Sequence, residues 1–271
     1  MASYSRIARK IIFWNHGDKD ILYTNLKQLS FFRKMNRIRL KLAYQKFDKV
    51  WVLNSEICKK IREAFQLNNV CVLPNPIDTT RIIEKSCCKV QEDIFTQSGV
   101  NIIMVGRLSP EKGYGRIIEI LRRMDENLEV NLIIIGDGAE RSTLEQNAKN
   151  NGILKKIYFL GSKKNPYCYI KHADLLICPS YTESFGLVML EAMLLKVPIL
   201  TTDTTGGRNV TCNGRYGKCV ENSEKVLEEE LNHFVKNPTI YQKYVADAYE
   251  RALSFDKKYF AKEITELLRM E

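Results

Sequence analysis

Long hydrophobic runs are absent from this 271-residue sequence. The apolar stretch 130–135 has the length of a buried strand, whereas a membrane-spanning helix needs about 18 apolar residues. Residues 1–10 are basic but lack the apolar core and the cleavage site of a signal peptide, so we expect a protein without an export signal. The expected location is therefore the reducing cytoplasm.

Glycine and proline are sparse as well, with 14 Gly and 7 Pro, which excludes collagen-like and disordered classes. The 8 cysteines are scattered and form no CxxC pair. Cys87 and Cys88 are adjacent, a spacing that suits neither a zinc site nor a simple disulfide bridge. Cys71 and Cys178 lie inside apolar, strand-like runs, where cysteine serves as a small buried hydrophobic residue.

Positive charge is in excess, since 42 Lys and Arg stand against 32 Asp and Glu, for a net charge of +10. This excess favours acidic partners, which include phosphorylated ligands, nucleic acid and anionic membrane surfaces, but it does not choose among them. At roughly 150 residues per domain, the length predicts about two domains.

The first part of the chain predicts short strands that alternate with helices. Strands are expected at 11–14, 50–53 and 70–73, and helices at 29–47, which is strongly basic, and at 56–65, with Ser55 as the N-cap. Pro74 and Pro76 end this series because proline cannot continue a strand, and the polar stretch up to Gly99 is the natural linker.

A second alternating series follows this linker. Strands are expected at 101–105, 130–135, 157–160, 175–178 and 198–201, and helices at 113–121, 140–150, 167–172, 187–195, 224–236 and 241–268. Continuous apolar strands between helices predict a parallel sheet that is covered on both faces. The fold class is therefore α/β with two lobes, and ligands are expected at the carboxyl ends of the strands.

One loop with phosphate-binding character follows the predicted strand 101–105. Gly106 and Gly113 let the backbone turn, and the next helix offers free N–H groups at its start. Arg107 supplies a forked donor and Lys112 a point charge, the combination that suits a diphosphate. The alternative is that both are solvated surface cations.

A second loop, residues 179–187, follows the predicted strand 175–178. The amides of Phe185, Gly186 and Leu187 would point at an anion, yet Glu183 and Glu191 stand beside them. Carboxylates repel phosphate but accept hydrogen bonds from sugar hydroxyls, so the pattern suits a ligand that carries both groups. The alternatives are a loop acid at Glu183 and a helix-dipole acid at Glu191.

These residues resemble a known motif. Glu183 and Glu191, with seven residues between them, resemble the EX7E motif of family 4 retaining glycosyltransferases of the GT-B type. Further landmarks agree in order and spacing: Gly106-Arg107-Leu108, Glu111-Lys112-Gly113, Gly136-Asp137-Gly138, Phe159-Leu160-Gly161, Ala173-Asp174, Thr205-Gly206-Gly207 and Tyr216-Gly217. Asn75-Pro76-Ile77-Asp78 is similar to the family's interlobe segment, and the likeness runs from about Ile11 to the C-terminus.

The resemblance implies a GT-B fold of two Rossmann-like lobes and assigns roles in donor binding. Arg107 and Lys112 would hold the diphosphate of a nucleotide-sugar, Glu183 would contact the transferred sugar, and Glu191 would bind the ribose hydroxyls. Asp137 and Gly138 would belong to the scaffold. The donor-binding set implied in this way is Arg107, Lys112, Gly161, Ser162, Glu183, Ser184, Phe185, Gly186, Leu187 and Glu191, with the base near 161–163.

His16 matches the place where such enzymes carry a functional histidine, and it would orient groups around the anomeric centre; a structural histidine is the alternative. The catalytic set is thus His16, Arg107, Lys112 and Glu183. Asp18-Lys19-Asp20 is formally a DxD metal signature, but a polar turn is preferred because cations and amides already neutralise the diphosphate. We expect neither a metal nor another cofactor.

Two departures from the family pattern stand out. The chain begins at about the family's fourth or fifth strand, so the first lobe is expected to be truncated, and Arg208-Asn209 stand where a Pro-Glu pair is usual. The expected domains are a partial acceptor-side lobe at 1–95, a nucleotide-sugar lobe at 96–245, and a C-terminal helix at 246–271 that packs back toward the first lobe.

The sequence therefore predicts a retaining, metal-independent glycosyltransferase that uses a UDP-, GDP- or ADP-sugar and a saccharide or lipid-linked hydroxyl acceptor. The alternative is an inactive nucleotide-sugar-binding remnant, or a subunit that needs a partner. The basic helix 29–49 suggests peripheral contact with the inner face of an anionic membrane, and a solvated helix face explains it equally well. Nucleic acid is not expected, because no basic motif interleaved with aromatic residues stands out.

Overall fold

The computed structural model describes residues 12–15, 38–90, 93–96 and 98–269. The chain forms two compact units, Met1–Asn75 and Pro76–Glu271. The linking segment 76–95, which we placed in the first lobe, groups with the second unit. In the described ranges, no helix combines the length and the apolarity that crossing a bilayer requires.

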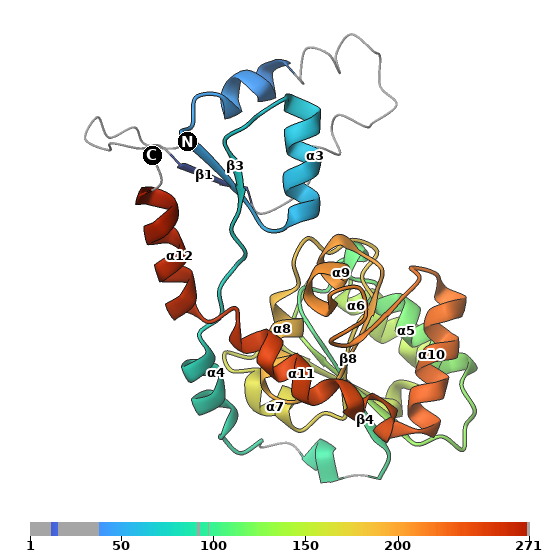
Figure 1. Cartoon of the computed structure of the whole chain (residues 1–271). Helices are drawn as coiled ribbons and strands as arrows, with labels where there is room; N and C mark the ends of the chain where they lie inside the picture. The colour runs from blue at the N-terminus through green and yellow to red at the C-terminus, as the bar shows by residue number, and fades with distance from the viewer. Residues whose placement is uncertain (1–11, 16–37, 91–92, 97, 270–271) are drawn as a thin grey trace. The chain divides into compact units, whose positions relative to one another are not determined.

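In its described part, the first unit contains a parallel sheet with the order β1-β2-β3 (Figure 1). The strands are β1 (Ile12–Asn15), β2 (Lys49–Val52) and β3 (Val70–Val72). Helix α3 (Ser55–Phe65) follows β2 and packs against β3. Of the basic helix predicted at 29–47, residues 38–47 are described: residues 38–44 are helical, whereas residues 45–47 form a turn, so the helix ends earlier than predicted.

The N-terminus of α3 corrects one prediction. The side chain of Asn54, not Ser55, accepts the backbone N–H of Ile57 at 2.9 Å and is the N-cap. Asparagine and serine cap helices about equally well, so the two adjacent residues could not be ranked from the sequence. Ile57 and Ile61 lie on the face of α3 that is buried against the sheet.

The second unit is built on a parallel sheet with the order β6-β5-β4-β7-β8-β9. Its strands are β4 (Val100–Val105), β5 (Val130–Ile135), β6 (Ile157–Gly161), β7 (Leu175–Cys178), β8 (Ile199–Thr202) and β9 (Lys218–Val220). The chain builds outward from β4 on one side and from β7 on the other. The α/β fold with parallel sheets that the sequence predicts is confirmed.

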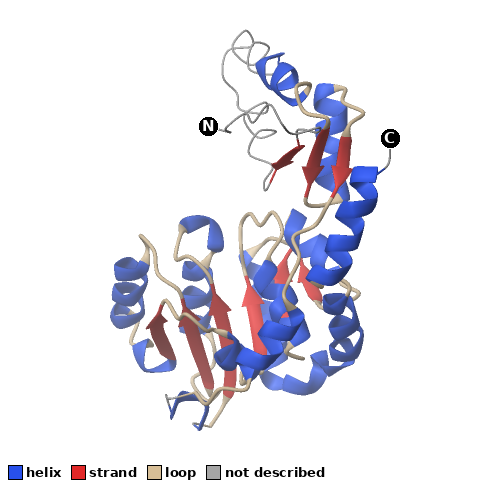
Figure 2. Ribbon diagram, turned by 90° about the vertical axis from the view of Figure 1, so that its left-hand side faces the viewer, coloured by secondary structure: helices blue, strands red, loops and turns tan. Residues whose placement is uncertain are grey.

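Helices cover both faces of this sheet (Figures 1 and 2). The helices of the second unit are α4 (Thr79–Ser86), α5 (Tyr114–Arg123), α6 (Arg141–Asn150), α7 (Tyr167–Lys171), α8 (Leu187–Leu194), α9 (Thr205–Thr211), α10 (Glu224–Lys236), α11 (Gln242–Leu253) and α12 (Lys257–Arg269). Helix α5 packs with α6 and α10, whereas α8 packs with α7 and α11, and the two groups lie on opposite sides of the strands in Figure 1.

The core of the second unit lies between β4, β5 and the group of α5, α6 and α10. Ile102, Leu132, Ile117, Leu227 and Phe234 belong to one buried cluster, and each is completely shielded from solvent. Burial of such a side chain contributes about 1.5–3 kcal/mol, so this cluster fixes the sheet and the loops that leave its carboxyl edge.

Two elements differ from their prediction. The polar linker contains α4, which Asp78 caps by accepting the N–H of Arg81. The single helix expected at 241–268 is divided into α11 and α12, and Asp256 at the break accepts the N–H groups of Thr79 and Lys258. Long-range partners of this kind cannot be read from helical periodicity.

Candidate functional site

The candidate site lies where the chain order of the sheet reverses. Strands β4 and β7 are neighbours, although β5 and β6 separate them in the sequence. In open parallel sheets, ligands bind outside the carboxyl ends of strands at such a switch point. The loops that leave β4 and β7 there are the two in which the sequence analysis places most of the donor-binding residues.

Direct hydrogen bonds join these two loops. The amide of Tyr181, in the loop after β7, donates to the carbonyl of Glu111, in the loop after β4, at 2.8 Å. Gly113 adopts a left-handed φ of 70°, and a Cβ atom there would lie 2.3 Å from the carbonyl oxygen of Pro179. The approach therefore requires glycine at this position.

The Gly136-Asp137-Gly138 segment supports the first loop from behind. The amide of Leu108 donates to the carbonyl of Asp137 at 3.0 Å. A Cβ atom at Gly138 would lie 2.2 Å from the carbonyl oxygen of Leu108, so this position also needs glycine. The backbones of Asp137 and Gly138 therefore both contact Leu108 of the first loop.

Lys112 and Glu183 form an ion pair that connects the two loops. The ammonium nitrogen of Lys112 lies 2.6 Å from Oε2 of Glu183, and the two side chains are 29% and 12% exposed. Burial lowers the pKa of Lys112, but the charge and the hydrogen bond of Glu183 raise it by more, so the pKa lies above its usual value. Lys112 is therefore a protonated cation at neutral pH.

The backbone of Glu183 is fixed by the start of α9. The amide of Gly206 donates to the carbonyl of Glu183 at 2.6 Å. A Cβ atom at Gly206 would lie 2.8 Å from Cγ of Glu183, so a larger residue would displace that side chain. This close approach explains the Thr205-Gly206-Gly207 landmark, although the sequence analysis did not predict the helix that carries it.

The start of α8 offers free amides beside the ion pair. Gly186 precedes the helix with a left-handed φ of 82°. In the described part of the chain, the amides of Phe185, Gly186 and Leu187 have no hydrogen-bond acceptor. The ring of Phe185 is buried against Phe255, with 5.9 Å between the centroids. This anchor holds the unpaired N–H groups at a helix start, which is where anions bind.

Glu191 lies on α8 and meets a residue that sequence reasoning missed. The hydroxyl of Tyr167, on α7, donates to Oε1 of Glu191 at 3.4 Å. Burial raises the pKa of Glu191, and the hydrogen bond from Tyr167 partly offsets this effect. Tyr167 is distant from Glu191 in the sequence and carries no spacing signal, so only the packing of α7 on α8 reveals it.

Four further predicted residues lie in the same unit but outside the ion pair. Arg107 is exposed, and its side chain has no hydrogen bond or ion pair with any described residue. Gly161 ends β6 with a left-handed φ of 67°, and Ser162 after it is exposed. Ser184 is half-buried between Glu183 and Phe185. His16 and the DxD-like Asp18-Lys19-Asp20 lie outside the described residues.

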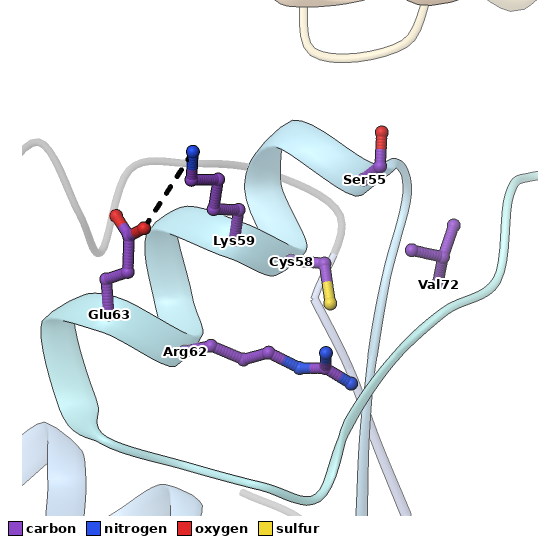
Figure 3. Close-up of a pocket in the computed structure, with 6 residues that line it drawn as sticks. All are labelled: Ser55, Cys58, Lys59, Arg62, Glu63 and Val72. Atoms are coloured by element: carbon purple, nitrogen blue, oxygen red, sulfur yellow. Dashed lines mark ion pairs between the residues drawn. The ribbon is translucent and has the colours of Figure 1, made fainter.

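A hollow in the first unit involves none of the predicted site residues. It has a volume of about 460 Å³ and lies between α3 and β3 (Figure 3), lined by Ser55, Cys58, Lys59, Arg62, Glu63 and Val72. The guanidinium of Arg62 donates to the carbonyl of Val70 at 2.6 Å. Arg62 thus shields a backbone group of β3, an outer strand of the described sheet, as charged side chains at sheet edges do.

The sequence of the second unit decides the family. Residues 91–251, more than half of the chain, match the family described as glycosyl transferases group 1. This chain is a member of that family. The matched region contains both loops of the switch point, the Lys112–Glu183 ion pair, Glu191 and Gly206.

Relatives in this family include proteins with assigned and unassigned activities. The chain is 25% identical over 299 residues to an uncharacterized glycosyltransferase of Methanocaldococcus jannaschii, covering 95% of this chain and 73% of that protein. It is 26% identical over 243 residues to a diphospho-undecaprenol-saccharide 4-alpha-N-acetylgalactosaminyltransferase of Campylobacter jejuni, covering 88% and 65%. It is 29% identical over 166 residues to the lipopolysaccharide glucosyltransferase WaaG of Escherichia coli, covering 60% and 41%.

Solved structures agree on the fold. Sucrose-phosphate synthase from Thermosynechococcus elongatus superposes with a TM-score of 0.77 at 19% identity, covering 95% of this chain and 67% of that one. Anabaena HepE, solved in complex with UDP and glucose, gives a TM-score of 0.76 at 19% identity, covering 97% and 72%. This group 1 glycosyltransferase family member therefore shares the α/β fold of GT-B glycosyltransferases.

Proposed function

We propose that this chain transfers a sugar from a nucleotide diphosphate sugar to a hydroxyl acceptor with retention of configuration. The observation that carries the proposal is the Lys112–Glu183 ion pair, which lies at the switch point beside the unpaired amides at the start of α8. This arrangement combines a cation and N–H donors for a diphosphate with a carboxylate for sugar hydroxyls.

Donor binding would exchange the partners of this ion pair. The diphosphate takes the ammonium of Lys112 and the amides of Phe185, Gly186 and Leu187, which are free in the described structure. Glu183 then loses its cation and accepts a hydroxyl of the transferred sugar. Arg107, exposed at the same edge, adds a second cation.

The leaving diphosphate is the group that gains negative charge as the sugar bond breaks. Fixed cations and amides that are aimed at this charge lower the barrier without reorganising, which is the main contribution we assign to this site. In this scheme Lys112, Arg107 and the α8 amides neutralise the charge, and no metal takes part. His16 keeps its proposed role near the anomeric centre.

The nucleoside would lie along the same edge of the sheet. Glu191 is proposed to accept hydrogen bonds from the ribose hydroxyls, and the base is proposed to rest near Gly161 and Ser162 at the end of β6. UDP is the first nucleotide to test, because the structural neighbour HepE was solved with UDP. GDP and ADP serve as the competing nucleotides.

A saccharide acceptor on a lipid carrier is proposed from the relatives and from one surface. The names of the Campylobacter and Escherichia relatives specify a diphospho-undecaprenol-linked saccharide and lipopolysaccharide. In the helix at 38–44, Ile38 and Leu42 are four residues apart and are 57% and 56% exposed, beside the exposed Arg39. Apolar and basic side chains on one helix suit peripheral contact with an anionic membrane.

Vesicle flotation tests this surface. The chain is expected to float with vesicles that contain anionic lipid at low salt and to be released at high salt. Leu42→Ser should reduce flotation, whereas Ile83→Ser, which changes an apolar residue of α4 that is 40% exposed, should not. Equal flotation of both variants, or binding that is insensitive to salt, contradicts membrane contact through this helix.

Donor turnover tests the activity itself. We expect UDP to raise the melting temperature of the purified chain, and UDP-sugars to be hydrolysed slowly and transferred when an acceptor is supplied. Nucleotide binding without any turnover would indicate an inactive remnant or a subunit that needs a partner. No binding of UDP, GDP or ADP would contradict the proposed donor site.

A further inference from the structure

Two cysteines that are far apart in the sequence meet at one asparagine of the second unit. The side-chain amide of Asn165 donates to the sulfur of Cys88 at 3.2 Å, and also to the carbonyl of Lys85 at 2.9 Å. The thiol of Cys168 donates to the backbone carbonyl of Asn165 at 3.7 Å. The thiols of Cys88 and Cys168 also interact with each other directly.

The scaffold around this cysteine pair is well packed. Cys88 lies two residues after the end of α4, and Cys168 lies on α7. Helices α4 and α7 contact each other and lie side by side in Figure 1. The contact between the two thiols is therefore held by the packing of two helices and by the shared asparagine.

The two thiols differ in exposure, and a third cysteine provides a comparison. Cys88 is exposed, whereas Cys168 is buried at 4% exposure. Cys87 is also exposed, but its thiol contacts a different group: its sulfur lies 3.4 Å from the backbone carbonyl of Ile83 within α4. Only one member of the adjacent Cys87-Cys88 pair thus reaches α7.

A metal site does not account for this arrangement. Throughout the ranges that the structure describes, no group of three or more His, Cys, Asp or Glu side chains is placed to hold a metal ion. Both cysteines are free thiols. Two interacting thiols, one exposed and one buried, that share contacts with Asn165 are placed so that an oxidant could reach one of them first.

We propose that Cys88 and Cys168 are a redox-sensitive pair that closes to a disulfide on exposure to a low-molecular-weight disulfide such as oxidised glutathione. The bond would tie the segment after α4 to α7. This inference is independent of the proposed glycosyl transfer, because none of its contacts involves the donor-binding residues.

The reaction balances as two thiol–disulfide exchanges. The thiolate of Cys88 attacks one sulfur of oxidised glutathione and releases the first glutathione thiolate, which takes up a proton. The thiol of Cys168 then loses its proton and attacks the sulfur of Cys88, and this releases the second glutathione. Two electrons pass from the protein to glutathione, and one protein disulfide and two glutathione molecules result.

The different surroundings of Cys88 and Cys168 indicate which thiol reacts first. Burial, together with the neighbouring Cys88 thiol, raises the pKa of Cys168 to about 11, so Cys168 does not start the exchange at neutral pH. The exposed Cys88 meets the oxidant first. Once Cys88 is in a mixed disulfide it can no longer ionise, so one cause of the raised pKa of Cys168 disappears. Closure should accelerate as the pH rises from 7 toward 9.

Peptide mapping by mass spectrometry tests the proposal. The reduced chain is incubated with oxidised glutathione at pH 8, alkylated and digested without reductant. We expect a peptide pair joined through Cys88 and Cys168, and a melting temperature that rises by roughly 5 °C or more and falls back with dithiothreitol. Cys87→Ser should behave like wild type.

Cys88→Ser changes an exposed residue and should fold normally, yet it should give no linked peptide and no rise in melting temperature. Cys168→Ser should leave glutathione attached to Cys88 as a stable mixed disulfide. Linkage that survives in Cys88→Ser, linkage through Cys87 instead, or a wild type whose thiols all stay free would each overturn the proposal.

Discussion

Replacement of Lys112 by alanine removes the cation that we place on the donor diphosphate. A hydrogen bond to a charged group contributes about 1.5–3 kcal/mol, so UDP binding should weaken roughly 10- to 150-fold. The variant also leaves Glu183, whose side chain is only 12% exposed, without its partner at 2.6 Å. The unpaired carboxylate repels the incoming diphosphate, which favours the upper part of this range.

Replacement of Glu183, the other member of the ion pair, is expected not to weaken UDP binding. Glu183→Gln frees Lys112 and removes a negative charge, so UDP should bind at least as tightly as it does to wild type, while sugar transfer is lost. The double variant Lys112→Ala with Glu183→Gln should bind UDP more tightly than Lys112→Ala alone, because the repulsion is gone.

Isothermal titration of UDP into each variant provides the measurement. Lys59→Ala is the matched control, because Lys59 is an exposed lysine of the first unit, 4.0 Å from Glu63. It should bind UDP like wild type. Unchanged UDP affinity in Lys112→Ala would refute the diphosphate role, and a double variant no better than Lys112→Ala would refute the exchange of partners.

Three further variants probe the supporting contacts. Tyr167→Phe removes the hydroxyl that lies 3.4 Å from Glu191 and should weaken UDP binding roughly 2- to 10-fold, with no further loss when Glu191 is already Gln. Burial raises the pKa of Glu191, so this carboxyl ionises at a higher pH in the folded chain than in the unfolded chain. The folded state is therefore destabilised as the pH rises from the usual carboxyl pKa through the raised one. Thermal melts should show wild type losing stability relative to Glu191→Gln with increasing pH. Gly113→Ala places a Cβ atom 2.3 Å from the carbonyl oxygen of Pro179 at a left-handed φ, so urea unfolding should show a loss of more than about 1 kcal/mol.

The α/β class and most strands could be predicted because buried parallel strands are continuous apolar runs. Residues 130–135 and 175–178 were bounded correctly from this signal alone. Helix α9 was missed because Gly206 and Gly207 lower helix propensity. These glycines are required by close approaches to Glu183 and to the carbonyl of Thr202, which no local pattern encodes.

The sequence predicted which loops form the candidate site but not the contacts between them. The loop positions of Lys112 and Glu183 follow from strand ends, but their ion pair depends on β4 and β7 being neighbours in the sheet. Contacts between distant segments were beyond the sequence analysis, as with Tyr167 on Glu191 and Cys88 on Cys168. In particular, Cys87 and Cys88 are adjacent in the sequence, which does not show that the thiol of Cys87 contacts Ile83 and that of Cys88 contacts Asn165.

A crystal structure of the chain with bound UDP tests the central claim most directly. The account predicts that the diphosphate lies at the carboxyl ends of β4 and β7, on the ammonium of Lys112 and the amides at the start of α8, with Glu183 released from Lys112. UDP bound elsewhere on the second unit, or bound with the Lys112–Glu183 pair intact and the α8 amides unused, would contradict it.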